Sequence, residues 1–345
     1  MHSIAPNMLP CGIANLGNTC FLNSCIQLLN NVQEIRAGWL SADSNHPDDN
    51  RVFSEWLELR AAMKGVRGKM PAPVITPGKF VNTIHSVART KGRELFTGWA
   101  QNDLPEFLLF MMDCMHNSRK RSVKMRIQGK SENATDSLAL KCYTMLKENY
   151  ERGDYSEFSD LFYGVYVSRL LTPNGSTVHS LKPEPYSILD LPIPPIGRRN
   201  PNLYDCFDAF VGDEVLSGWL NEKTNRKEDV RKNMVFWSFP QILIITLKRF
   251  SADGRLKNST LVDFPIDLLD LCKYSVGYKA SKNKYELIGV ANHMGGVSGG
   301  HYTAYGWGRE DSKWYLYNDT DVRVVDDPRR IVSQSAYCLW YRRMD

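Results

Sequence analysis

Two segments near opposite ends of the chain carry side chains that could together perform thiol chemistry. In the first segment, Cys20 follows polar, turn-forming residues and stands directly before an apolar pattern typical of a helix. A cysteine in the first turn of a helix lies near free backbone N–H groups and the positive end of the helix dipole, which favour the nucleophilic thiolate. Asn18 or Thr19 is the predicted helix cap. The alternative is that Cys20 is a small buried apolar residue, an interpretation that suits Cys25 better.

A thiol nucleophile needs a base, and His301 is the histidine best placed to supply one. It follows the glycine-rich loop 295–300 and begins a predicted strand. An adjacent antiparallel strand would return Asn318 or Asp319 to His301, where either side chain could accept the ring N–H and fix the tautomer. Alternatively, Asn318 and Asp319 form a hairpin turn and His301 is a hydrogen-bonded residue at the sheet edge.

Acyl transfer also requires hydrogen-bond donors directed at the oxyanion that develops on the attacked carbonyl. Asn15 and Asn18 lie on the loop before Cys20, and either side-chain amide could act beside the backbone N–H of Cys20. Asparagines in loops also serve as turn formers, so this segment allows both interpretations.

The elements that must position these residues change in kind along the chain. Apolar residues recur at helical spacing in four early segments: 21–29, 52–63, 77–87 and 103–115. Stretches typical of strands follow at 164–171, 186–193, 241–250, 285–290, 301–307, 313–317 and 336–342. The Pro-rich connector 183–201 and the polar segment 222–232 are predicted to be a turn region and an exposed loop. Helices first and strands later predict an α+β fold with a central antiparallel sheet.

Composition argues against several classes of protein. The chain has 345 residues, of which 43% are hydrophobic and 23% are charged, as in ordinary globular enzymes. Its eight cysteines include no CxxC pair, and we find neither a secretory signal nor an apolar stretch of membrane-spanning length. We therefore expect reduced thiols, no membrane association and an intracellular location, in cytoplasm or nucleus. A net charge of +5, spread along the chain, argues against nucleic-acid binding.

Five motifs in order along the chain carry a specific resemblance. Residues 17–24 read Gly-Asn-Thr-Cys-Phe-Leu-Asn-Ser, and residues 299–305 read Gly-Gly-His-Tyr-Thr-Ala-Tyr. Between them lie Gln-Asn-Asp-Leu-Pro-Glu-Phe-Leu at 101–108, Leu-Lys-Arg-Phe at 247–250 and Asp-Phe-Pro at 263–265. Together these segments closely resemble the catalytic boxes and landmarks of ubiquitin-specific proteases, and the resemblance spans almost the whole chain.

This resemblance implies a papain-like cysteine protease fold in a single catalytic domain, 1–345. The family's hand-like architecture would place a helical thumb at about 11–150, β-rich fingers at about 165–240, and a β-sheet palm at about 151–164 and 241–345. It also implies an enzyme, a thiol-dependent deubiquitinase that hydrolyses the isopeptide or peptide bond after the C-terminal Gly-Gly of ubiquitin. The implied partners are ubiquitin or ubiquitin-conjugated proteins, and we expect a monomer.

The resemblance also implies roles for individual residues. Cys20 would be the nucleophile, His301 the base and Asn318 the orienting third residue. Asp319 could assist, and Asn15 aligns with the oxyanion-stabilising position. The residues implied to bind the ubiquitin tail are Gln101, Asp103, Glu106, Phe250, Gly299, Gly300 and Tyr302.

Among the tail-binding candidates, Asp103 and Glu106 align with acidic residues that hold the arginine-bearing tail through charge-assisted contacts. The alternative for both is an exposed helix face. The glycines at 299–300 and Tyr302 align with the channel that admits the tail. Phe250 aligns with a palm residue near the tail, and a role in the core is the alternative.

One departure from the family pattern concerns metal. Many members bind a structural zinc through two CxxC pairs at the fingertips, but the corresponding turns, 171–176 and 218–223, contain no cysteine. We therefore expect zinc-free fingers, with no metal or cofactor elsewhere. Two other functions stay open: a protease for a ubiquitin-like modifier with the same Gly-Gly end, and a catalytically inactive ubiquitin-binding scaffold.

Overall fold

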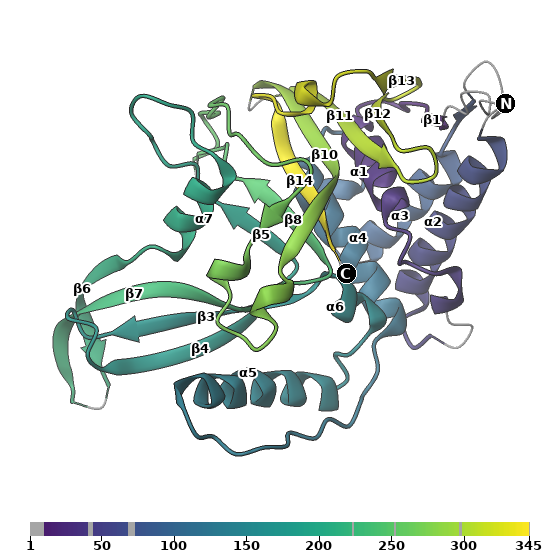
Figure 1. Cartoon of the computed structure of the whole chain (residues 1–345). Helices are drawn as coiled ribbons and strands as arrows, with labels where there is room; N and C mark the ends of the chain where they lie inside the picture. The colour runs from purple at the N-terminus through teal and green to yellow at the C-terminus, as the bar shows by residue number, and fades with distance from the viewer. Residues whose placement is uncertain are drawn as a thin grey trace, which may run out of the picture.

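Helices make up most of the N-terminal part of the chain and strands most of the remainder (Figure 1). The computed structural model describes residues 10–40, 44–67, 73–222, 224–251, 253–296 and 299–344. Its α-helices are α1 (Cys20–Asn31), α2 (Pro47–Val66), α3 (Gly78–Thr90), α4 (Leu104–Arg119), α5 (Ala134–Glu151), α6 (Glu157–Phe162) and α7 (Leu203–Val211). The four predicted helical segments fall on α1 to α4, and the predicted α+β class is confirmed.

An eight-stranded sheet, the main sheet, forms the centre of the molecule. Its strands follow the order β13-β12-β11-β10-β14-β8-β5, with β9 beside β10. Neighbours are antiparallel except for the parallel pair β5 and β8. The bounds are β5 (Ile188–Leu191), β8 (Ile242–Leu247), β9 (Leu269–Asp270), β10 (Lys284–Gly296), β11 (Gly299–Gly308), β12 (Lys313–Asn318), β13 (Asp321–Val325) and β14 (Ala336–Arg343).

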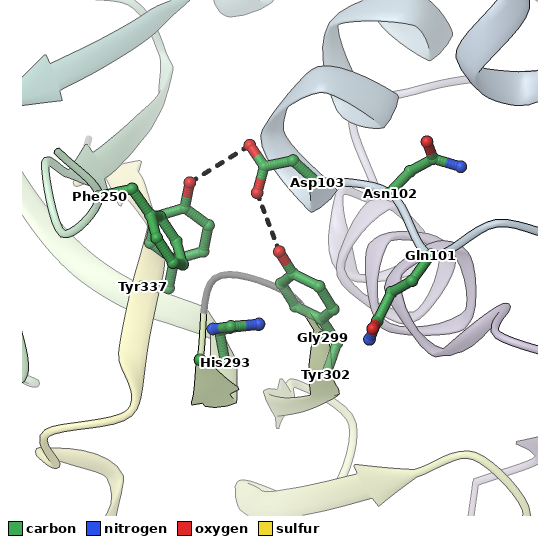
Figure 2. Close-up of a pocket in the computed structure, with 9 residues that line it drawn as sticks. Gln101, Asn102, Asp103, Phe250, His293, Gly299, Tyr302 and Tyr337 are labelled. Carbon is green, nitrogen blue, oxygen red and sulfur yellow. Dashed lines mark hydrogen bonds between the residues drawn. The ribbon is translucent and has the colours of Figure 1, made fainter. Parts of the chain in front are cut away.

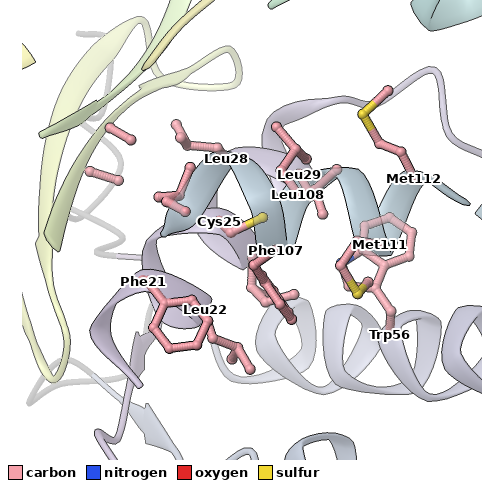
Figure 3. Close-up of a cluster of buried hydrophobic side chains, with 14 of the residues drawn as sticks. Phe21, Leu22, Cys25, Leu28, Leu29, Trp56, Phe107, Leu108, Met111 and Met112 are labelled. Atoms are coloured by element: carbon pink, nitrogen blue, oxygen red, sulfur yellow. The ribbon is translucent and has the colours of Figure 1, made fainter. Parts of the chain in front are cut away.

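The two faces of the main sheet bury different helices. In β8, Ile242 and Ile244 join the cluster that contains α1, whereas Leu243 and Ile245 join the cluster that contains α7. Figure 3 shows the first cluster, in which side chains of α1 lie beside side chains of α4 and α2. Alternating side chains thus hold a helix on each face of the sheet.

Helix α1 packs directly against β10 and β11. Gly289 in β10 permits this close approach, because a Cβ atom at that position would overlap with Cδ2 of Leu28 in α1. Burial of an apolar helix face against a sheet is the main stabilising term in such a contact. The packing places the N-terminal turn of α1, which begins with Cys20, against the strand that carries His301.

A second sheet of four strands extends from the main sheet, at the left of Figure 1. Its order is β4-β3-β7-β6. The bounds are β3 (Gly164–Leu171), β4 (Val178–Tyr186), β6 (Glu214–Asn221) and β7 (Arg226–Ser238). Helix α5 packs on one face of this sheet, where Ala139 and Cys142 contact a cluster that includes Val165, Val167 and Trp237.

The prediction of an exposed loop at 222–232 is wrong from Arg226 onwards. Strand β7 begins there and pairs with both β6 and β3. Most of the side chains from 226 to 232 are charged and face water on both sides of a thin sheet, so the apolar alternation that marks a strand is absent. The predicted connector 183–201 likewise begins inside β4 and contains β5, which pairs with β8 of the main sheet.

A short parallel pair of strands, β1 (Gly12–Ile13) and β2 (Val74–Ile75), positions the segment before Cys20. The backbone N–H of Ile13 also donates to the carbonyl of Asp319, at 2.9 Å. Strand β2 and the turn at Asp319 therefore both bind the start of the segment that leads to Cys20. Among the described residues, no helix has the length and apolar character that crossing a membrane requires.

Candidate active site

Cys20 is the first residue of α1, and its side chain is buried, with 2% exposed. Thr19 holds the N-cap position, although its side chain makes no cap hydrogen bond. The sulfur accepts hydrogen bonds from the backbone N–H groups of Tyr302 and Phe21. Burial raises the pKa of the Cys20 thiol, and these two donors partly oppose that effect. Because Tyr302 directly follows His301, the thiol contacts the backbone one residue after the candidate base.

His301 lies on β11, and its Nε2 is 2.6 Å from Oδ1 of Asn318, the last residue of β12. The register pairs Ala304 with Tyr317, so Asn318 is a diagonal neighbour of His301 across the two strands. An amide oxygen can accept but cannot donate, so Nε2 carries a proton, and in the neutral ring the lone pair is then on Nδ1. A neutral imidazole in this tautomer is the form that can take a proton from a thiol.

Asp319 forms the turn after β12, with φ at +50°, and its carboxylate contacts two asparagines of the nucleophile segment. It accepts hydrogen bonds from Asn15 Nδ2 at 2.9 Å and from Asn23 Nδ2 at 2.8 Å. The two interpretations of residues 318–319 therefore hold together, because these residues form a hairpin turn and also reach the site. Among the described residues, the Asp319 carboxylate is hydrogen-bonded to Asn15 and Asn23. No hydrogen bond among them joins this carboxylate to the His301 ring.

The side chain of Asn15 is held at both ends. Its Oδ1 accepts from the backbone N–H of Thr19 at 3.1 Å and from the Thr19 hydroxyl at 3.2 Å, while its Nδ2 donates to Asp319. One N–H of Nδ2 is left for another acceptor, and the backbone N–H of Cys20 has no intrahelical partner at the first helical position. These two donors can serve an oxyanion. Asn18 instead donates to a backbone carbonyl of the neighbouring loop, at 3.0 Å.

Gln101 lies between Cys20 and Gly300 of β11. Its Oε1 accepts from the backbone N–H of Gly300 at 2.9 Å, and its Nε2 donates to the Gly300 carbonyl. The same Nε2 lies 3.8 Å from the Cys20 sulfur. A side-chain amide that binds both backbone groups of one residue imitates a neighbouring extended chain. Gln101 thus occupies the place that a peptide approaching Cys20 along β11 would take.

Asp103 lies in a cleft of about 360 Å³ beside Gln101. Figure 2 shows its carboxylate between two tyrosine hydroxyl groups, which donate to it from Tyr302 at 2.9 Å and from Tyr337 at 3.2 Å. Burial raises the pKa of Asp103 to about 6, although the tyrosine hydrogen bonds act in the opposite direction. A partly buried carboxylate surrounded by aromatic rings is suited to hold a cationic side chain.

The remaining predicted residues lie around the same cleft. Phe250 and Gly299 line it, and Phe250 also packs against the core cluster that contains α1, so its two interpretations are compatible. Glu106 is exposed on α4 and lines an adjoining groove together with Asp103. Of the glycine-rich loop 295–300, residues 297–298 lie outside the described residues.

His293 and Tyr337 are among the residues of this cleft that sequence reasoning missed. His293 is buried on β10 opposite Tyr302, and burial lowers its pKa to about 4. An antiparallel hairpin closed by the glycines at 295–300 implies that pairing, so the register could have identified His293. Tyr337 enters from β14, whose place beside β10 no local pattern indicates.

A family model described as "Ubiquitin carboxyl-terminal hydrolase" matches residues 11–341. The chain belongs to this family. The segment matched contains every residue of the cleft and both halves of the thiol–imidazole site. The resemblance to ubiquitin-specific proteases that the motifs suggested is therefore confirmed.

Curated relatives of the ubiquitin carboxyl-terminal hydrolase family support this membership. The chain is 33% identical over 343 residues to ubiquitin carboxyl-terminal hydrolase Usp2 of Drosophila melanogaster, covering 96% of this chain and 35% of the relative. It is 34% identical over 348 residues to ubiquitin carboxyl-terminal hydrolase 2 of Homo sapiens, covering 96% of this chain and 54% of the relative. The chain thus spans about a third to a half of the length of these relatives.

Solved structures share the fold of this family member. One is the SAGA Ubp8/Sgf11/Sus1/Sgf73 DUB module bound to ubiquitin aldehyde, with a TM-score of 0.69 and 21% identity, covering 97% of this chain and 69% of that chain. A second structure of the Ubp8 module, bound to monoubiquitin, has a TM-score of 0.66. The predicted papain-like fold is confirmed by these matches.

The described residues contain no group of three or more His, Cys, Asp or Glu side chains that could hold a metal ion. All eight cysteines are unpaired. In the first of the two turns, 171–176, the hydroxyl groups of Thr172 and Ser176 donate to Asn174 Oδ1 at 2.7 and 2.8 Å. Polar side chains thus tie this turn together. In the second turn, Lys223 lies outside the described residues.

Proposed function

We propose that this member of the family is a thiol-dependent deubiquitinase that hydrolyses the isopeptide or peptide bond after the C-terminal Gly-Gly of ubiquitin. One observation carries the proposal. The Cys20 sulfur contacts the backbone N–H next to His301, whose ring is hydrogen-bonded to Asn318 at 2.6 Å. These two contacts bring the proposed nucleophile next to the strand of the proposed base and the proposed base next to the proposed orienting residue, and this supports the proposal.

In the proposed reaction, Nδ1 of His301 takes the Cys20 proton and the thiolate attacks the carbonyl carbon of the terminal glycine. The resulting oxyanion is held by Asn15 Nδ2 and the Cys20 backbone N–H. When the C–N bond breaks, the imidazolium gives its proton to the leaving amine and a thioester remains. Water then attacks the thioester while His301 takes a proton from it. The C–S bond breaks, and His301 passes this proton to the Cys20 thiolate.

The cleft accounts for the proposed substrate. Asp103, with Glu106 on the adjoining groove, would bind the cationic residues of the ubiquitin tail, and the thin backbone at 299–300 would admit the Gly-Gly end. Tyr302 and Phe250 provide apolar walls. Entry of the tail requires that Gln101 give up its hydrogen bonds to Gly300.

Other properties follow from this proposal. Ubiquitin or ubiquitin conjugates are the partners, and the site needs no cofactor. The thumb, fingers and palm correspond to about 11–150, 165–240, and 151–164 with 241–345. We place the enzyme inside the cell, in cytoplasm or nucleus, in accordance with eight unpaired thiols, and we expect a monomer.

The test is hydrolysis of ubiquitin carrying a fluorogenic amide at its C-terminus. Cys20→Ala should abolish turnover and leave ubiquitin binding intact. Cys25→Ala is the matched control, because Cys25 is a fully buried thiol in the same helix and should retain turnover. Turnover by Cys20→Ala would refute the assignment of the nucleophile. Activity confined to a substrate made with a ubiquitin-like modifier would show that the modifier is assigned wrongly.

A further inference from the structure

Asn23 is a buried polar residue next to the site that the proposed reaction leaves without a role. It lies one turn after Cys20 on α1, and 2% of the residue is exposed. Its Nδ2 donates to Asp319 Oδ1 at 2.8 Å and lies 3.3 Å from the carbonyl of Ala14. Its Oδ1 is buried and has no hydrogen-bond partner among the described residues.

The unpaired oxygen shows which end of this amide matters. A buried acceptor without a partner is unfavourable, and turning the amide over would remove the contact of Nδ2 with Asp319. The reversed orientation would also set the amide oxygen against a carboxylate, which is repulsive. The direction of Asn23 is therefore determined by what its Nδ2 holds, namely Asp319 and the backbone just before Asn15.

Asp319 in turn holds Asn15. One carboxylate oxygen accepts from Asn23 and the other accepts from Asn15, so the carboxylate bridges the two amides. The charge of Asp319 raises the pKa of the Cys20 thiol and so opposes formation of the thiolate. Thr19 holds the Oδ1 end of the Asn15 amide and the Asp319 carboxylate holds the Nδ2 end, so Asp319 contributes to the direction of the Asn15 N–H groups.

The backbone makes this bridge rigid. Gly12 lies so close to the turn after β12 that a Cβ atom there would be 2.6 Å from the carbonyl oxygen of Thr320. The N–H of Ile13 donates to the carbonyl of Asp319 at 2.9 Å. The segment before Asn15 and the turn that carries Asp319 are thus held together, with Asn23 beneath them.

We infer that Asn23 is a positioning residue for the oxyanion site: it fixes the Asp319 carboxylate, which fixes the Asn15 amide so that its second N–H is directed at the oxyanion. The inference rests on the proposed function for the identity of the reaction. It assigns Asn23 no contact with substrate.

The test compares Asn23→Leu with Gln27→Leu by steady-state kinetics on the fluorogenic ubiquitin substrate. Gln27 is the matched control because it is a buried amide one turn further along α1, whose Nε2 donates to the carbonyl of Cys11 at 2.8 Å, away from Asp319. We expect Asn23→Leu to lower kcat about tenfold with KM unchanged, since a displaced oxyanion donor loses transition-state stabilisation alone. Gln27→Leu should change kcat by less than about twofold, with a similar effect on thermal stability.

A double-mutant cycle with Asn15→Ala separates positioning from general destabilisation. If Asn23 acts through Asn15, Asn23→Leu should lower kcat by less than about twofold in the Asn15→Ala background. A further tenfold loss in that background, or an equal loss of kcat in Gln27→Leu, would overturn the inference.

A crystal structure of Asn23→Leu provides a measurement that needs no activity. We expect the Asp319 carboxylate and the Asn15 amide to rotate out of contact with each other. An Asn15 amide in its original position would overturn the inference. Failure of the unaltered protein to hydrolyse ubiquitin amides would instead count against the proposed function, and the structural comparison would still decide the role of Asn23.

Discussion

Replacement of Asp103 by Asn should stabilise the fold at neutral pH while it weakens substrate binding. Burial raises the pKa of this carboxyl group from its usual 3.8 to about 6 in the folded protein. The difference is about 2 pKa units, and each unit corresponds to about 1.4 kcal/mol. Ionisation of Asp103 therefore costs the folded state about 3 kcal/mol relative to the unfolded chain at pH values above 6.

The sign of the pH dependence follows from the raised pKa. Below about pH 3.8 the carboxyl group is protonated in both states and has no effect. Between pH 3.8 and 6 the unfolded chain loses the proton first, so the free energy of unfolding falls as pH rises, and the loss is complete above pH 6. An amide at position 103 does not ionise, so Asp103→Asn should escape this loss.

Urea unfolding of both proteins from pH 4 to pH 7.5 measures this difference. We expect the stability of Asp103→Asn relative to the unaltered protein to rise by about 2.5 kcal/mol across that range, while KM for a ubiquitin substrate increases about tenfold at pH 7.5. Glu106→Gln, which removes an exposed carboxylate in the first turn of the helix that Asp103 precedes, is the control for the unfolding measurement alone. A stability difference that stays constant with pH, or falls, would show that ionisation of Asp103 does not destabilise the folded protein.

Three further predictions concern the site and the fingers. Asn318→Ala should lower kcat about a hundredfold because His301 loses the acceptor that fixes its tautomer, whereas Asn318→Asp should keep most activity; equal losses in both variants would contradict this. Gln101→Ala should speed alkylation of Cys20 by iodoacetamide several-fold, since Gln101 covers a thiol that is 2% exposed, and an unchanged rate would show that the side chain does not shield it. Elemental analysis of the purified protein should find zinc far below one atom per chain, and one tightly bound zinc would show that the fingers are wrongly described.

The sequence predicted those parts of the fold where the local residue pattern agrees with the tertiary environment. Helix α1 is apolar on the face that meets the main sheet. The predicted strand 164–171 coincides with β3, because its alternate residues Val165 and Val167 are buried in the cluster that also contains α5. The contact between His301 and Asn318 was also predictable, since a hairpin of known length returns residue 318 to the strand of His301. These relations depend on residues close in sequence or on a simple strand period.

The rest depends on contacts between distant segments that no local pattern indicates. The strand at Arg226–Ser238 begins with a run of charged residues, and pairing on both sides makes it a strand in spite of that composition. The bridge from Asn23 through Asp319 to Asn15 joins a helix to a turn almost 300 residues away. No local pattern indicates this contact, and the sequence prediction considered only the neighbouring strand, which suggested His301 as the partner of Asp319. Tyr337 reaches the cleft through the order of the strands in the main sheet.

Covalent capture shows which side chain reacts at the C-terminus of ubiquitin. Ubiquitin with an electrophile in place of its C-terminal carboxylate is incubated with the protein, and the modified residue is identified by mass spectrometry. We predict one adduct per chain, on Cys20, lost in Cys20→Ala and retained in Cys25→Ala. Absence of an adduct, or an adduct on any other cysteine, would show that Cys20 is not the nucleophile of a deubiquitinase.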